Sequence, residues 1–278
     1  MTSTPVSPSS GRRDWMLLAV GAVTNFFDTL GIGSFATTTA CYKLVPELRR
    51  TVPDRLIPGT LNVGHTPPTI LQAVIFIVAI AVDPRTLWSM IAAAAVGAWF
   101  GAGYVARWPK CTVQLVMGVA LLVAASAMTM TQLALFPGGG DALGVTGLRL
   151  AVAVAVSLVL GALMTMGIGF YAPCMILVTL LGMSPRTAFP IMMGACAFLM
   201  PVASVRFVRA RAFEPRAALG LAVGGVPAVL IAAFIVKSLP LTALRWLVVA
   251  VVLYTAAMLL AAATAGRGVT QPTPSLET

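Results

Sequence analysis

The chain has 278 residues, of which 59% are hydrophobic and only 9% are charged, and its mean hydropathy is +0.96. Soluble domains carry charge on about a quarter of their residues, so this composition excludes a soluble globular protein. The net charge of +10 does not point to nucleic acid, because cytoplasmic loops of membrane proteins are rich in Lys and Arg for orientation alone. We therefore expect a lipid bilayer, and no nucleic acid, around this chain.

Long segments with almost no charge recur along the chain, at residues 56–82, 111–136, 148–181 and 217–236. Each reaches or exceeds the roughly 20 residues with which an α-helix crosses a bilayer. The segments are solidly apolar and lack the alternation of barrel strands, which argues against a membrane β-barrel. The sequence thus predicts an all-α polytopic protein of the cell inner membrane.

The predicted elements form two membrane halves joined by a Gly-rich linker. Residues 1–14 are polar, and we place them in the cytoplasm. The first membrane half covers residues 15–136, with predicted helices at 15–30, 34–46, 57–80, 86–106 and 111–135. After the linker at 137–147, the second half covers 148–264, with predicted helices at 148–166, 170–182, 188–205, 216–236 and 241–264, and a polar tail follows at 265–278.

Landmarks of the first half return in the second half in the same order. Thr29-Leu30-Gly31-Ile32-Gly33 recurs 136 residues later as Thr165-Met166-Gly167-Ile168-Gly169. The further pairs are Pro53 and Pro58 with Pro185 and Pro190, Asp83-Pro84-Arg85 with Glu214-Pro215-Arg216, and Pro109 with Pro240. Chance could supply any one match, but the preserved order and spacing indicate that the two halves are homologous.

Each half is predicted to open with a helical hairpin broken at its Gly-x-Gly tip. The segments after the tips, 34–46 and 170–182, have 13 residues each. As helix they would measure roughly 20 Å, which is too short to cross a bilayer comfortably. If each hairpin returns to its starting side, the basic residues of 12–13, 43–55, 107–110, 206–216 and 267 share one face, and the other face holds Arg85, Arg149, Arg186, Lys237 and Arg245. This bias predicts inverted repeats with both termini in the cytoplasm.

The two tips are the predicted substrate site. Their glycines permit close backbone approach, and Ser34 is placed to open the following short helix as its N-cap. Free amides at the positive end of a helix dipole suit an anion. The predicted substrate-binding residues, which supply these amides and nearby hydroxyls, are Thr29, Gly31, Gly33, Ser34, Thr37, Thr165, Gly167, Gly169 and Tyr171. The alternative is that these small residues only let helices pack closely.

Asp28 and His65 are ionisable residues at membrane depth, which makes them candidates for proton coupling. Asn25 and Asn62 lie one turn before them as supporting polar residues. The alternatives are a structural bond from Asp28 to the amides of the opposite tip, and a satisfied interior His65. The cysteines form no CxxC pair and no metal-ligand spacing, so we expect neither a metal nor a cofactor.

The duplicated halves, the Gly-x-Gly tip in each, and Ala172-Pro173-Cys174-Met175 after the second tip resemble the sulfite exporter TauE/SafE family, also called the toluene-sulfonate uptake permeases. The resemblance covers roughly residues 15–263. It implies duplicated membrane domains and transport of sulfite, sulfonates, sulfoacetate or related anions. Family members often carry a third glycine after the Gly-x-Gly and a proline further on. Here Ser34 and Phe170 replace that glycine, and only the second half keeps the proline, as Pro173.

These features predict a secondary transporter for a small anion, with sulfite or an organosulfonate such as sulfoacetate as substrate, working by alternating access around the tips. The sequence contains no Gly-x-x-x-x-Gly-Lys-Ser/Thr loop, so we expect neither ATP use nor enzymatic activity. Two alternatives remain open. Ser34 with His65 faintly resembles the dyad of intramembrane serine proteases, although no glycine follows Ser34 and Phe170 takes its place in the second tip. The other alternative is a membrane scaffold that transports nothing.

Overall fold

The structure, a computed structural model, describes residues 8–30, 33–105, 107–135, 140–165 and 170–235, together with single residues between 246 and 264. This part of the chain is helical and contains no strand; one isolated β-bridge joins Ala142 to Met183. The predicted all-α class is therefore confirmed.

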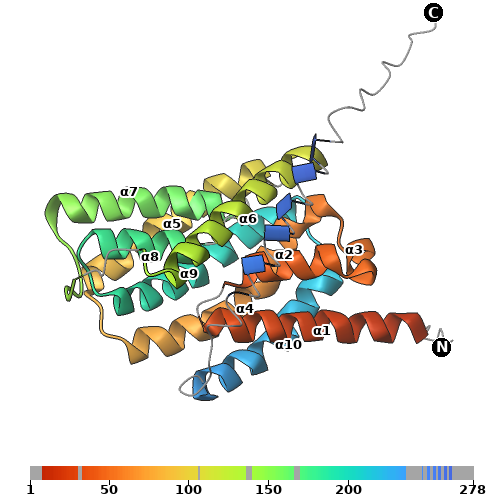
Figure 1. Cartoon of the computed structure of the whole chain (residues 1–278), viewed down its shortest axis with the longest axis horizontal. Coiled ribbons are helices and arrows are strands. Elements are labelled where there is room, and N and C mark those ends of the chain that lie inside the picture. Colours follow the sequence, from red (N-terminus) through yellow and green to blue (C-terminus); the bar gives the residue numbers. More distant parts are fainter. Residues whose placement is uncertain are drawn as a thin grey trace, which may run out of the picture.

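The helices follow the predicted order (Figure 1). The first half contributes α1 (Pro8–Thr29), α2 (Ser34–Leu44), α3 (Pro46–Thr51), the 3-10 turn η1 (Asp54–Leu56), α4 (Ile57–Ala79), α5 (Pro84–Val105) and α6 (Lys110–Gln132). The second half contributes α7 (Gly147–Met164), α8 (Tyr171–Leu180), the 3-10 turn η2 (Pro185–Thr187), α9 (Ala188–Arg209) and α10 (Pro215–Ile235). The described residues between 246 and 264 are also helical, within the predicted helix 241–264.

Two of the predicted helices differ from the structure in a way that has a clear physical cause. Helix α1 begins at Pro8, because exposed polar residues such as Arg12 and Arg13 continue the helix beyond the apolar stretch. The predicted helix 34–46 ends at Leu44, and a separate helix α3 starts at Pro46. The cause is Pro46, which forces the preceding Val45 into an extended conformation, with φ −90° and ψ 115°.

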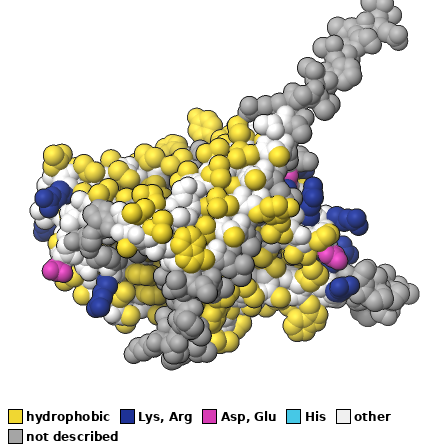
Figure 2. Space-filling view, viewed as in Figure 1, with side chains coloured by type: hydrophobic (Ala, Val, Ile, Leu, Met, Phe, Trp, Pro, Cys, Tyr) yellow, Lys and Arg dark blue, Asp and Glu magenta, His cyan; other side chains and the backbone are white. Residues whose placement is uncertain are grey.

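The surface of the molecule matches an apolar environment. Five helices of the described chain are long and apolar enough to cross a membrane: Asp54–Ala79, Pro84–Tyr104, Gly147–Met164, Ala188–Arg209 and Pro215–Ala233. Large apolar side chains such as Val78 and Leu148 are more than 80% exposed. Figure 2 shows Lys and Arg side chains gathered at the two ends of the long axis, with hydrophobic side chains between them. This arrangement indicates a membrane-embedded protein.

Two parallel helix pairs pack with their backbones in close contact. Helix α1 lies against α10 and helix α5 against α7, while α4 and α9 pack against each other between them. At the α5–α7 contact, a Cβ atom added to Gly97 would overlap the carbonyl oxygen of Leu158. At the α1–α10 contact, a Cβ atom on Gly21 would lie 2.6 Å from the carbonyl oxygen of Gly220. Such contacts between small residues are the usual basis of helix association in lipid.

The described end of the linker is fixed to the α4–α5 connection. The carboxylate of Asp83 accepts hydrogen bonds from the amide (2.8 Å) and the hydroxyl (2.9 Å) of Thr86. Asp83 thereby caps the start of α5. These hydrogen bonds hold the pKa of Asp83 below its ordinary value. The Val145 amide then donates to the Thr86 hydroxyl at 3.0 Å. The Asp83 amide also donates to the Leu143 carbonyl at 2.9 Å, so the linker is joined to the start of α5 at two points.

We expect Gly97→Ala to lower the free energy of unfolding by about 1–3 kcal/mol, because the new Cβ meets backbone that cannot move aside. This outcome opposes helix propensity, which favours alanine. Gly11→Ala in α1 is the control, since nothing lies within 4 Å of the added atom. Thermal unfolding in detergent measures the difference, and equal melting temperatures for the two variants would contradict the close packing of α5 on α7.

Candidate functional site

A buried polar cluster lies where the end of α1, the start of α2 and the middle of α4 meet. Its side chains are at most 5% exposed although they sit among apolar helices, and they are Asn25, Asp28, Thr29, Ser34, Thr38, Asn62, His65, Thr69 and Gln72. Most of them were predicted as site residues from the sequence. Buried polar groups at such depth are costly unless they are hydrogen-bonded, so their partners determine what the cluster can do.

The first tip is closed by Asp28. Its Oδ1 atom accepts a hydrogen bond of 2.6 Å from the amide of Ser34, the first residue of α2. Gly33 occupies the N-cap position with φ +86°, a conformation that favours glycine. The prediction that Ser34 is the N-cap is therefore wrong. The turn at Gly33 brings the carboxyl group of α1 onto the helix terminus, and Asp28 performs the capping that a serine would otherwise provide.

His65 connects three helices through its two ring nitrogens. Its Nδ1 atom lies 3.0 Å from Asn25 Oδ1 on α1, and its Nε2 atom lies 2.9 Å from the Thr38 hydroxyl on α2. Because Asn25 Nδ2 donates to the Gly21 carbonyl at 2.8 Å, its Oδ1 atom is the acceptor facing the ring. A neutral imidazole with its proton on Nδ1, accepting from Thr38 at Nε2, satisfies every contact. No ring nitrogen is left for a substrate.

Gln72 is a member of the cluster that was not predicted. Its Nε2 atom donates to the Thr29 hydroxyl at 2.9 Å, and that hydroxyl donates to the Asn25 carbonyl at 2.8 Å. The Gln72 side chain also interacts with the carboxyl group of Asp28. A signal for this residue exists in the sequence, since Asn62, His65, Thr69 and Gln72 recur at helical spacing along one face of α4.

The second half meets this cluster through Tyr171, the first residue of α8. Its phenol interacts with the Asp28 carboxyl group and also donates to the sulfur of Met193 on α9. Thr165 is buried, but its hydroxyl donates to the Ala162 carbonyl of its own helix at 2.7 Å. Of the predicted tip glycines, Gly31, Gly167 and Gly169 lie outside the described residues.

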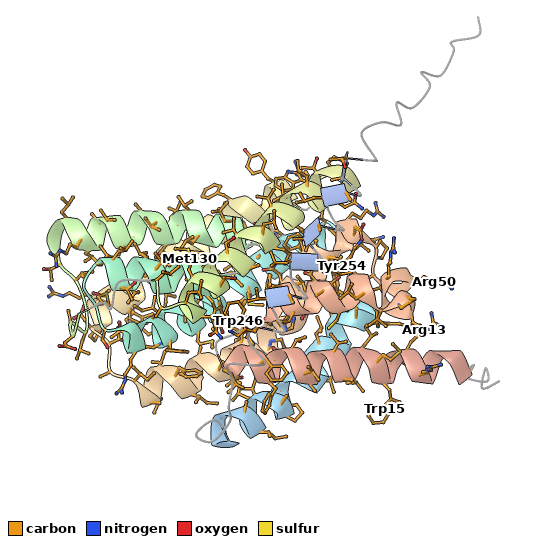
Figure 3. All side chains as sticks on the ribbon, viewed as in Figure 1. Arg13, Trp15, Arg50, Met130, Trp246 and Tyr254 are labelled. Carbon is orange, nitrogen blue, oxygen red and sulfur yellow. The ribbon has the colours of Figure 1, made fainter. Side chains whose placement is uncertain are left out.

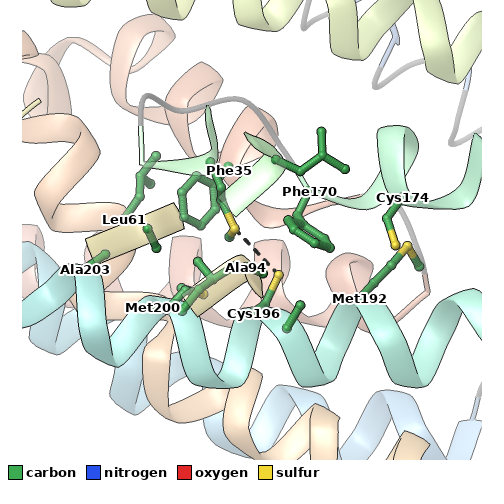
Figure 4. Close-up of a cluster of buried hydrophobic side chains, with 14 of the residues drawn as sticks. Phe35, Leu61, Ala94, Phe170, Cys174, Met192, Cys196, Met200 and Ala203 are labelled. Atoms are coloured by element: carbon green, nitrogen blue, oxygen red, sulfur yellow. Dashed lines mark hydrogen bonds between the residues drawn. The ribbon is translucent and has the colours of Figure 1, made fainter. Parts of the chain in front are cut away.

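Sulfur and aromatic side chains gather around Met164 and Phe170, the described residues on either side of the second tip. Phe35 at the start of α2 and Phe170 before α8 lie over the same stretch of α9 (Figure 4). There the Cys196 thiol lies 3.6 Å from the sulfur of Met164. Met164 stands 136 residues after Asp28, which is the offset between the two Gly-x-Gly motifs. The two tips therefore differ in chemistry, with oxygen and nitrogen groups on one side and soft sulfur groups on the other.

Two predicted residues make local hydrogen bonds. The Thr37 hydroxyl donates to carbonyls of Gly33 and Ser34, both at 3.0 Å. Asn62 Nδ2 donates to the Pro58 carbonyl at 2.8 Å. The side-chain oxygens of Asn62 and Gln72 are buried and accept no hydrogen bond from the residues that the structure describes. Such acceptors in a buried cluster are available to a ligand, a water molecule or a protonated carboxyl group.

No fixed positive charge faces the cluster among the described residues. Among the described residues, the buried basic side chains are His65 and Lys43. Lys43 lies at the end of α2 far from the cluster, where it is paired at 2.6 Å with Asp54 of η1. The described residues also contain no group of three His, Cys, Asp or Glu side chains that could hold a metal ion. For chemistry the cluster offers the Ser34 amide, hydroxyl groups, side-chain amides and one carboxyl group.

Comparisons with models of protein families, with curated proteins and with solved structures find no match to this chain. Its function is therefore inferred from the cluster itself.

We expect Thr38→Val to lower the free energy of unfolding by about 1–3 kcal/mol, because it leaves the buried Nε2 atom of His65 without a donor. Thr38→Ser keeps the hydroxyl and is the matched control. Chemical denaturation in detergent measures both. Wild-type stability of the valine variant would show that His65 does not depend on Thr38.

Proposed function

We propose that the chain is a secondary transporter for small anions, with sulfite or an organosulfonate such as sulfoacetate as the preferred substrate class. The observation that carries this proposal is the capped start of α2, a helix N-terminus buried among hydroxyl groups and met by Tyr171 from the other half. Helix N-termini are the usual anion sites of proteins, and in transporters they stand where a helix is broken. The resemblance of the Gly-x-Gly tips to the sulfite exporter TauE/SafE family supports the same substrate class.

The proposed architecture is a pair of inverted repeats that move against each other. Helix packing supports it. In the proposed repeats α1 corresponds to α7, α4 to α9 and α5 to α10. The contact of α1 with α10 then corresponds to the contact of α7 with α5, and α4 packs against its own counterpart α9. Both exchanged contacts are made through glycines. In Figure 1, α1 begins at the end marked N, whereas α7 begins at the opposite end. Helix α3 packs against α1, which supports a hairpin that returns to its starting side.

In this proposal, Asp28 competes with the substrate for the same helix terminus. Its carboxyl group takes the Ser34 amide that an anionic substrate would use, and two negative groups cannot share it. The side chains that face Asp28 are Ser34 on α2, Gln72 on α4, Tyr171 on α8 and Cys196 on α9, and none of them carries positive charge.

Proton uptake by Asp28 removes its negative charge and releases the amide of α2. The unpartnered side-chain oxygen of Gln72 then provides an acceptor for the new proton near the carboxyl group. None of the described residues lies within 4 Å of a Cβ atom added to Gly33, which leaves room beside them for a small anion at the terminus. A proton and an anion would thus enter together, and Asp28 would carry the coupling proton.

The protease alternative gains no support from the site. Ser34 interacts with Asp28, while both ring nitrogens of His65 are bonded to Asn25 and Thr38. A serine nucleophile needs a base within hydrogen-bond reach. His65 is better explained as the structural link between α1, α2 and α4.

Purified protein in liposomes should take up sulfite or sulfoacetate, and the same anions should raise its melting temperature. Thr29→Ala and Thr165→Ala should weaken anion binding about tenfold or more, since each removes a hydroxyl beside a tip. Thr129→Ala is the control, because its hydroxyl bonds within α6, outside the cluster. Absence of both flux and thermal shift with sulfite, sulfate, thiosulfate, sulfoacetate and small carboxylates would favour a scaffold.

Uptake should rise several-fold as the pH falls through the titration of Asp28, because only the protonated carboxyl group frees the α2 terminus. Asp28→Asn should bind anions with an affinity independent of pH and should no longer move protons with them. Asp141→Asn in the exposed linker removes a carboxylate elsewhere and should behave as wild type. Flux assays with a pH-sensitive dye report both movements; a pH dependence that survives in Asp28→Asn would exclude Asp28 as the coupling group.

A further inference from the structure

A basic cavity lies at the end of the bundle where α1 begins, away from the buried cluster. Its volume is about 440 Å³, and its walls are Lys43 and Leu44 at the end of α2, Pro46, Arg49 and Arg50 of α3, and Tyr254 from the helical residues near the C-terminal end of the chain. The cavity therefore joins the first half to the last helix of the second half.

The positive charge of this cavity comes from α3. Lys43 is neutralised by Asp54 at 2.6 Å, and Gln114 on α6 also donates to that carboxylate. Arg49 and Arg50 are exposed, and neither forms an ion pair among the described residues. Glu47 lies on the same short helix, and within the described chain it makes no ion pair with them either. Two guanidinium groups are thus left to face an anion.

The cavity is polarised along the long axis of the molecule. Figure 3 shows Arg50 toward the end where the chain begins, and Tyr254 nearer the middle of the bundle. Tyr254 is 60% exposed, so the part of the lining nearer the middle of the bundle is aromatic, and Leu44, which is 37% exposed, adds an apolar side chain to the walls. Charge at the outer end and apolar surface further in is the profile of the interface between headgroups and acyl chains.

We infer that this cavity binds the phosphodiester headgroup of an anionic phospholipid. Arg49 and Arg50 hold the phosphate through charge-assisted hydrogen bonds, and Leu44 and Tyr254 contact the glycerol and the first acyl carbons. Basic pockets between membrane helices are suited to such headgroups. A freely soluble anion such as inorganic phosphate gains nothing from the apolar wall, which favours the lipid as the source of the phosphate. This inference is independent of the proposed transport.

The test compares binding of phosphatidylglycerol and phosphatidylcholine to the delipidated full chain by native mass spectrometry and by thermal shift. Phosphatidylglycerol should bind and raise the melting temperature, whereas phosphatidylcholine and inorganic phosphate should not. Arg49→Gln with Arg50→Gln should weaken phosphatidylglycerol binding about 30-fold, taking roughly 1 kcal/mol for each arginine near a charged lipid surface.

The matched control is Arg107→Gln with Arg209→Gln, which removes the same charge from exposed positions that do not line the cavity. It should retain wild-type binding. Arg49→Lys with Arg50→Lys keeps the charge and should recover most of the affinity, which separates loss of binding from loss of folding. Equal losses in the two glutamine variants, or equal binding of the two lipids, would overturn the inference. A thermal shift with inorganic phosphate as large as that with phosphatidylglycerol would instead assign the cavity to a soluble anion.

Discussion

The hydrogen bond from the Ser34 amide to Asp28 is the constraint on which the first hairpin depends. A helix that starts inside a bilayer exposes amides that lipid cannot satisfy, so such a start needs a partner from the protein. Gly33 makes the turn, and Asp28 supplies the acceptor. Once α2 is fixed in this way, Thr38 faces His65, and α4 is tied to the same unit.

Most of the fold could be predicted from the sequence, because prolines, glycines and charges interrupt apolar segments at recognisable places. The proline at position 46 is also visible in the sequence, yet the predicted helix 34–46 includes it. The pattern of apolar residues alone does not show that the helix ends before this proline. The cap was harder. Serine is a preferred N-cap residue and Ser34 stands at the right position, whereas the reach of Asp28 depends on the angle of the turn at Gly33.

The site was only partly predictable for a related reason. Asn25, Asp28 and His65 are conspicuous because polar residues are rare in apolar helices, but nothing in the sequence says which of them touch. The contact of Tyr171 with Asp28 joins residues more than 140 positions apart. The order of the landmarks indicates that two tips exist. Their offset also gives Met164 as the counterpart of Asp28, but it does not determine which side chains of the second half lie against the polar cluster.

That asymmetry has a mechanical consequence. Within the cluster, the described hydrogen bonds of His65 and Gln72 join α1, α2 and α4 to one another. These three helices of the first half therefore form one rigid piece at this point. The surface that the second half turns toward it includes the thioether and thiol of Met193 and Cys196. Sulfur contacts are polarizable and tolerate changes of angle and distance. At this surface the contact between the halves is therefore softer in its geometry than the directional hydrogen bonds that hold α1, α2 and α4 together.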